Sequence, residues 1–91
     1  MAVVTVKVYT TLKDKLGFSQ IEIKADTLKD AVIFLCNKNP LIKDIILDKK
    51  NRVKNYFVIT VNSDVVDNFK ISKIKLNDGD IINIFPPVAG G

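Results

Sequence analysis

Hydrophobic and polar residues alternate along four short segments of the chain, 4–9, 20–25, 56–61 and 81–85. A period of two is typical of strands that bury one face. The first and last segments are the most apolar, so we expect them to lie side by side in the middle of a sheet. In that arrangement Tyr9 and Phe85 project from the outer face of the sheet, near the same end.

A helical period appears after the second predicted strand. Thr27 is suited to cap a helix start, and Asp30 places a negative charge in the first turn, where the helix dipole favours it. Pro40 ends this pattern, and residues 41–46 suggest a short second helix. The inward stripe consists of Leu28, Ala31, Val32, Leu35 and Cys36.

Turn signals separate these elements. Residues 11–16 read as a short turn or helical turn closed by Gly17, and residues 62–64 precede a short 65–66 segment that can pair back. Asp78 and Asp80 flank Gly79, which favours a turn over a catalytic carboxylate pair. The order predicts an α+β roll with a mixed sheet of about five strands, one main helix and a short second helix.

Length and composition fit a single domain over residues 1–91, with a flexible tail at 86–91. The chain is 47% hydrophobic and 26% charged, as in ordinary globular proteins. Apolar runs fall well short of the roughly 20 residues that span a bilayer, and the first residues do not resemble a secretory signal. We therefore expect a cytoplasmic protein that does not bind membranes.

The sequence contains no histidine and a single cysteine, Cys36. The absence of imidazole removes the commonest general base and the commonest metal ligand. Cys36 lies on the inward helix stripe, so we interpret it as a small buried hydrophobic residue rather than a sulfur carrier. These observations disfavour a catalytic role for the domain alone and predict no metal site and no directly bound cofactor.

The net charge is +4, and basic residues are densest in the segment from Lys49 to Lys54. Such a cluster is more often a solvated loop than a nucleic-acid site. The chain has one arginine, Arg52, and the cluster has no interleaved aromatic residues, so neither base recognition nor stacking is supported. We expect no nucleic-acid partner.

The last two residues are Gly90 and Gly91. A diglycine lacks Cβ atoms and can pass through a narrow channel. A frayed end without function is the alternative, because termini tolerate small residues. The residues before it favour function: prolines stiffen the base of the tail, and six extended residues from Pro86 reach roughly 20 Å.

The tail from Asp78 to Gly91 resembles the end of the small subunit of molybdopterin synthase, a member of the MoaD/ThiS family of sulfur carriers. These proteins have the ubiquitin-like β-grasp fold, and the family includes the sulfur carrier of thiazole synthesis. The segment 6–17 is similar to the family's first strand and short helix, and Val61-Asn62 to its mid-chain turn. The resemblance covers the whole chain, and the tail is its most specific part.

The resemblance implies that the Gly91 carboxylate is adenylated by an E1-like enzyme that uses ATP. A sulfur donor protein then converts it to a thiocarboxylate, which donates sulfur to a pterin precursor in the large synthase subunit. Gly90 provides the slim tip. The positions that the family presents to partners correspond to Tyr9, Val65, Phe85, Pro86, Pro87, Val88 and Ala89.

The chain departs from the family pattern at two places, and neither lies in the tail. Lys13 stands where arginine is frequent, so a bidentate ion pair is not expected there. Ser63-Asp64 replaces a turn that usually contains glycine.

Several alternatives stay open. Gly91 could be joined to lysines of other proteins, as in a ubiquitin-like modifier, or the domain could serve thiazole synthesis. A plain interaction module with an inert tail is a further alternative. Tyr9 and Phe85 could also be ordinary packing residues.

Overall fold

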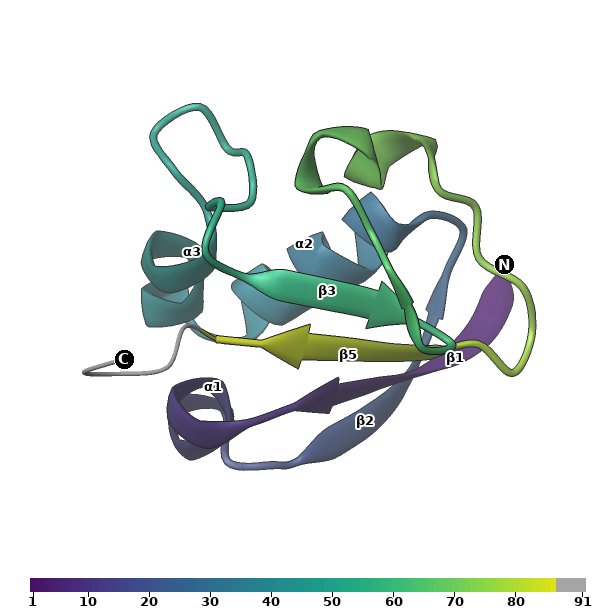
Figure 1. Ribbon diagram of the computed structural model, residues 1–91. Helices are drawn as coiled ribbons and strands as arrows, with labels where there is room; N and C mark the ends of the chain where they lie inside the picture. Colours follow the sequence, from purple (N-terminus) through teal and green to yellow (C-terminus); the bar gives the residue numbers. More distant parts are fainter. Residues whose placement is uncertain (87–91) are drawn as a thin grey trace.

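The computed structural model describes residues 1–86 of the chain. Within this range the predicted strands and helices follow one another in the predicted order, and a 3₁₀ helix that was not predicted precedes the last strand (Figure 1). They are β1 (Ala2–Val8), α1 (Thr10–Leu16), β2 (Gln20–Ala25), α2 (Leu28–Lys38), α3 (Pro40–Ile46), β3 (Val58–Val61), β4 (Asp64–Val65), the 3₁₀ helix η1 (Asn68–Lys73) and β5 (Ile81–Phe85).

The strands of residues 1–86 form one five-stranded sheet in the order β2-β1-β5-β3-β4. β1 and β5 are parallel, with Val6 opposite Ile82 and Val8 opposite Ile84, while β2, β3 and β4 are antiparallel to their neighbours. The prediction that the first and last strands lie side by side is therefore confirmed. The mixed sheet with its covering helices is the ubiquitin-like β-grasp architecture.

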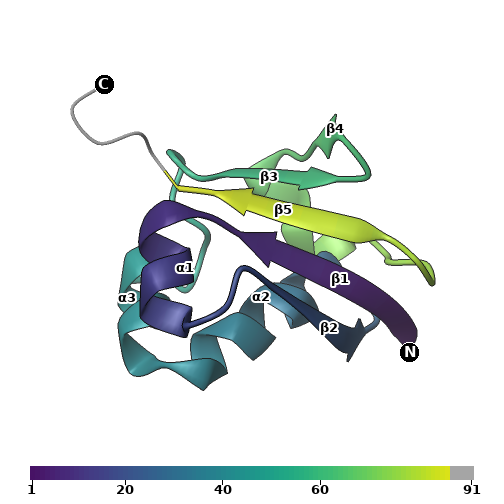
Figure 2. The same cartoon turned by 90° about the horizontal axis from the view of Figure 1, so that it is seen from below.

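The helices cover one face of the sheet, as the view from below shows (Figure 2). The predicted apolar stripe of α2 is buried in full, and its first turn has the predicted cap: Thr27 Oγ1 accepts from the Asp30 N–H, and the Asp30 carboxylate accepts from the Thr27 N–H. Pro40 ends α2 and also begins α3, where its missing N–H costs nothing. The inner face of the sheet contributes Val4, Val6, Val8, Ile59, Ile82 and Ile84 to the core.

Two turns at the start of β5 are joined by hydrogen bonds. Asp80, which is buried, accepts from the Asn77 N–H and from the Asn62 side-chain amide, at 2.8 Å and 2.7 Å. Asn62 in turn accepts from the Ile81 N–H at 2.9 Å. Asp78 accepts from the Val3 N–H of β1. The interpretation of both aspartates as turn residues is thus confirmed.

The hairpin between β3 and β4 turns through two residues with positive φ, Asn62 at 51° and Ser63 at 77°. Such turns match the twist of the paired strands and favour asparagine and glycine. Ser63 therefore occupies a position where glycine would be less strained. The predicted pairing of the following segment is confirmed, because Val65 lies opposite Thr60.

Substitution of a buried residue of β5 tests the assigned core. Ile84→Ala removes a fully buried side chain from β5 and should lower the free energy of unfolding by about 2–5 kcal/mol. Val65→Ala, at a side chain that is 74% exposed, is the control and should change it by less than about 0.5 kcal/mol. Urea denaturation measures both, and equal effects would contradict the assigned core.

Candidate functional site

The end of β5 carries an aromatic pair on the outer face of the sheet. Parallel pairing places Val8 beside Ile84, so the residues that follow, Tyr9 and Phe85, are neighbours. Their rings are stacked, with centroids 4.8 Å apart and planes 12° apart. The Tyr9 hydroxyl donates to the Asn83 side-chain oxygen at 2.5 Å. The predicted placement of Tyr9 and Phe85 on one face is confirmed.

A third apolar residue extends this pair. Val58 of β3 lies directly opposite Phe85. Both side chains are exposed, Phe85 to 38%. We call Tyr9, Val58 and Phe85 the outer apolar patch. Sequence reasoning left out Val58, although its alternation with Phe57 and Ile59 already placed it on the outer face. Exposed apolar side chains that gather at one point are typical of interaction surfaces.

Val65, another predicted partner contact, lies on the same outer face but farther from the tail. It is opposite Thr60, which itself pairs with Asn83 of β5. Thr60 is nearly buried and separates Val65 from β5. The structure therefore brings Tyr9 and Phe85 together and leaves Val65 outside the outer apolar patch.

The tail leaves the domain beside this patch. Pro86 follows Phe85 directly and is half-buried. It lines a shallow groove of about 450 Å³ together with residues of α1 and α3, among them Thr11, Leu41 and Ile45. Pro87, Val88, Ala89, Gly90 and Gly91 lie outside the described residues.

Cys36 and Lys13 take no part in the outer apolar patch. Cys36 is buried, and this burial raises the pKa of its thiol, as expected for a packing residue. Lys13 is exposed on α1 and has no carboxylate within 4 Å among residues 1–86.

Among residues 1–86 no group of three or more Cys, Asp or Glu side chains could hold a metal ion. No helix there is long and apolar enough to cross a membrane.

Solved structures of similar fold include a small archaeal modifier protein. The small archaeal modifier protein 1 of Methanosarcina acetivorans is 27% identical, with a TM-score of 0.86 over 100% of this chain and 98% of its own. A chain of the Amycolatopsis orientalis BexX/CysO complex is 29% identical, with a TM-score of 0.78 over 97% of this chain and 99% of its own.

A third structure, described as molybdopterin converting factor subunit 1 of Pyrococcus furiosus, is 23% identical. It has a TM-score of 0.73 over 97% of this chain and 100% of its own, and at this identity it supports the fold alone. Among curated protein sequences, none matches this chain significantly.

The model of the ThiS family matches residues 6–91, nearly the whole sequence. This match includes the end of the first strand, both turns that precede β5 and the diglycine end. The chain therefore belongs to the ThiS family of small ubiquitin-like sulfur carriers.

Proposed function

We propose that this protein is the sulfur-donating small subunit of a molybdopterin synthase and that it has no catalytic activity by itself. The Gly91 carboxylate is adenylated by an E1-like enzyme with ATP, and a sulfur donor protein replaces AMP to leave a thiocarboxylate. That sulfur then passes to a pterin precursor in the large subunit. The cytoplasm, which supplies ATP, is the expected location.

The observation that carries the proposal is the position of the outer apolar patch. β5 lies in the middle of the sheet and ends at Phe85, which is stacked on Tyr9. Pro86, the start of the tail, follows Phe85 directly. A partner that contacts this patch therefore lies beside the first residue of the tail. Binding at the patch would hold the tail near the partner's active site, which raises its effective concentration there.

The chemistry needs a carboxylate that is free of the domain's own side chains. Adenylation turns this poor electrophile into a mixed anhydride with a good leaving group, and sulfur then attacks the carbonyl carbon. The chain has no histidine, and its cysteine is buried with a raised thiol pKa. The partners therefore supply the acid–base and sulfur chemistry, and this domain supplies recognition and the acyl group.

Two observations favour further candidates. The identity to the archaeal modifier protein supports a modifier in which a substrate lysine attacks the activated Gly91 carbonyl. The ThiS family match supports a carrier for thiazole synthesis. The tail from Phe85 to Gly91 favours the pterin pathway through its resemblance to the synthase subunit. All three proposals share the same activation step and differ in what accepts the acyl group or its sulfur.

Mass spectrometry of the protein purified from its native cells distinguishes these fates. A C-terminus at Gly91 in which sulfur replaces one oxygen supports the carrier, and an isopeptide remnant of this C-terminus on lysines of other proteins supports the modifier. Cells that actively make the molybdenum or tungsten cofactor are the right source. Finding neither product in them would contradict both proposals.

Shortening the tail tests the terminal mechanism. Deletion of Gly91, or Gly90→Trp, should abolish ATP–pyrophosphate exchange with the activating enzyme because the carboxylate no longer reaches the nucleotide. The thermal unfolding midpoint should stay unchanged, since neither residue follows directly on the sheet. If the shortened protein still supported molybdopterin synthesis, the mechanism would be wrong.

Phe85→Ala tests the outer apolar patch. Loss of this ring should weaken binding to the large synthase subunit by at least about tenfold, as expected for an interface aromatic. Its cost in stability should be smaller than that of Ile84→Ala, because the Phe85 ring is 38% exposed and Ile84 is fully buried. The stacked pair accounts for about 0.5–1.5 kcal/mol of that cost. Phe69→Ala, an exposed aromatic on η1, is the matched control and should bind normally in calorimetric titrations. A collapse of thermal stability in Phe85→Ala would instead identify Phe85 as a core residue.

A further inference from the structure

A groove on the helical side of the molecule has no part in the proposed carrier chemistry. It lies between α2, the loop 47–56 and η1, and its volume is about 820 Å³, within the range of roughly 300–1,000 Å³ that ligand sites have. Figure 1 shows this loop and η1 at the same end of the molecule, with α2 behind the sheet. Its lining includes none of the outer apolar patch, and it shares Lys54 and Tyr56 with the shallow groove that Pro86 lines.

The floor of the groove is apolar. Val32 and Cys36 come from α2, Val53 from the loop, and Ile71 from η1, and all of them are buried. Burial keeps the pKa of the Cys36 thiol raised, so this side chain is uncharged at neutral pH. The floor therefore suits an aliphatic or aromatic side chain.

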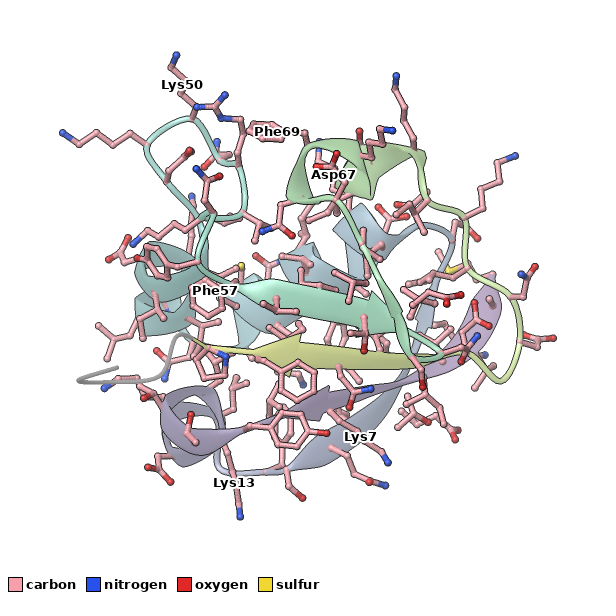
Figure 3. The ribbon with its side chains drawn as sticks, in the orientation of Figure 1. Lys7, Lys13, Lys50, Phe57, Asp67 and Phe69 are labelled. Atoms are coloured by element: carbon pink, nitrogen blue, oxygen red, sulfur yellow. The ribbon has the colours of Figure 1, made fainter. Side chains whose placement is uncertain are left out.

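Large apolar side chains also stand exposed at the lip. Ile33, Tyr56 and Phe69 all line the groove, and Phe69 is 73% exposed. Figure 3 shows Phe69 and Lys50 projecting at the same end of the molecule. Exposing a phenylalanine to water is unfavourable, and an occupant of the groove would cover this ring.

The rim is basic. Four basic residues line the groove, Lys29, Lys43, Arg52 and Lys54. Its lining contains one acidic residue, Asp48. Lys29 and Lys43 have no carboxylate within 4 Å among residues 1–86. Their charges are therefore available to an occupant.

Asp48 is already engaged within its own loop. Its carboxylate accepts from the Lys50 and Arg52 backbone N–H groups at 2.8 Å and 3.0 Å, and it pairs with the Arg52 guanidinium at 3.3 Å. The hydrogen bond from the Arg52 backbone is the largest cause that lowers the Asp48 pKa. Asp48 thus stays ionised and offsets Arg52, which leaves the lysines as the uncompensated charge of the rim.

Asn68, which lines the groove, has a buried polar atom without a partner among residues 1–86. The Asn68 amide nitrogen donates to the Lys54 and Phe57 carbonyls, at 3.2 Å and 2.9 Å, and so ties η1 to the loop. Its Oδ1 is buried and accepts no hydrogen bond from residues 1–86. A buried acceptor of this kind is costly when left unpaired, and it marks the junction as the place where a further donor would be stabilising.

We propose that this groove binds an acidic peptide segment of a protein partner, with one apolar side chain of the peptide on the floor and carboxylates at Lys29 and Lys43. Charge complementarity carries this assignment, together with the exposed apolar lip. A nucleic acid fits less well, because the chain's one arginine is already paired with Asp48 and the floor offers nothing to a phosphate. The site would act independently of Gly91, so it goes beyond the proposed carrier function.

Selection from a random dodecapeptide display library on the immobilised full-length protein tests the proposal. Enriched peptides should combine several Asp or Glu residues with one Leu, Phe or Trp. Titration of an enriched synthetic peptide into the ¹⁵N-labelled protein should shift amide signals of α2, the loop 47–56 and η1. Signals of β1 and of the outer apolar patch should not move.

Variants assign the contact. The double change Lys29→Glu and Lys43→Glu should lower the affinity for the peptide by at least about tenfold. Phe69→Ser should lower it by a similar factor. The control, Lys13→Glu with Lys24→Glu, makes the same charge change on exposed positions of α1 and β2 and should alter affinity by less than about twofold.

Three results would overturn the proposal: no enrichment, enrichment without acidic residues, or equal effects in groove and control variants. An oligouridine dodecamer is the competing probe. If it bound more tightly than the peptide and lost binding in the groove variants, the groove would be a nucleic-acid site instead.

Discussion

The parallel pairing of β1 with β5 is the constraint on which the rest of the structure depends. It sets Val6 opposite Ile82 and Val8 opposite Ile84, so the buried faces of both strands coincide and α2 has a continuous apolar surface to pack against. The same register brings Tyr9 to Phe85. A shift of one of these strands by one residue would turn its buried row outward. Core and outer apolar patch are thus two results of a single register.

Much of this fold could be predicted from local periodicity, because alternation alone decides which side of a strand is buried. The apolar stripe of α2 and its N-cap Thr27 were equally readable, whereas the hydrogen bond from the Thr27 N–H back to Asp30 was not predicted. Two further features were not. The 3₁₀ helix η1 (Asn68–Lys73) has too few residues for a repeating pattern, and the groove beside it arises where the loop 47–56, α2 and η1 meet. The tail residues were identified through resemblance, since diglycine has no side-chain pattern to interpret.

The molecule presents two surfaces of different character. The outer apolar patch is small and adjoins Pro86, whereas the groove combines an apolar floor with lysines that have no carboxylate within 4 Å among residues 1–86. α2 lines this groove and buries Cys36. This burial matters in a sulfur carrier, because an exposed thiol could attack an activated carboxylate or form a mixed disulfide with sulfur donors. A buried thiol with a raised pKa is poorly placed for either reaction.

The strand order also has a consequence for how the chain folds. β3 and β4 reach the rest of the sheet only through β5, which follows every other strand in the described sequence. Until β5 pairs with β1, β1 has an open edge and the inner face of the sheet is incomplete. The contacts between β1 and β5 join distant parts of the sequence, and contacts of this kind are slow to form. The Tyr9–Phe85 pair exists only once this step is finished. An enzyme that recognises the pair would therefore select completed molecules and pass over nascent or truncated chains.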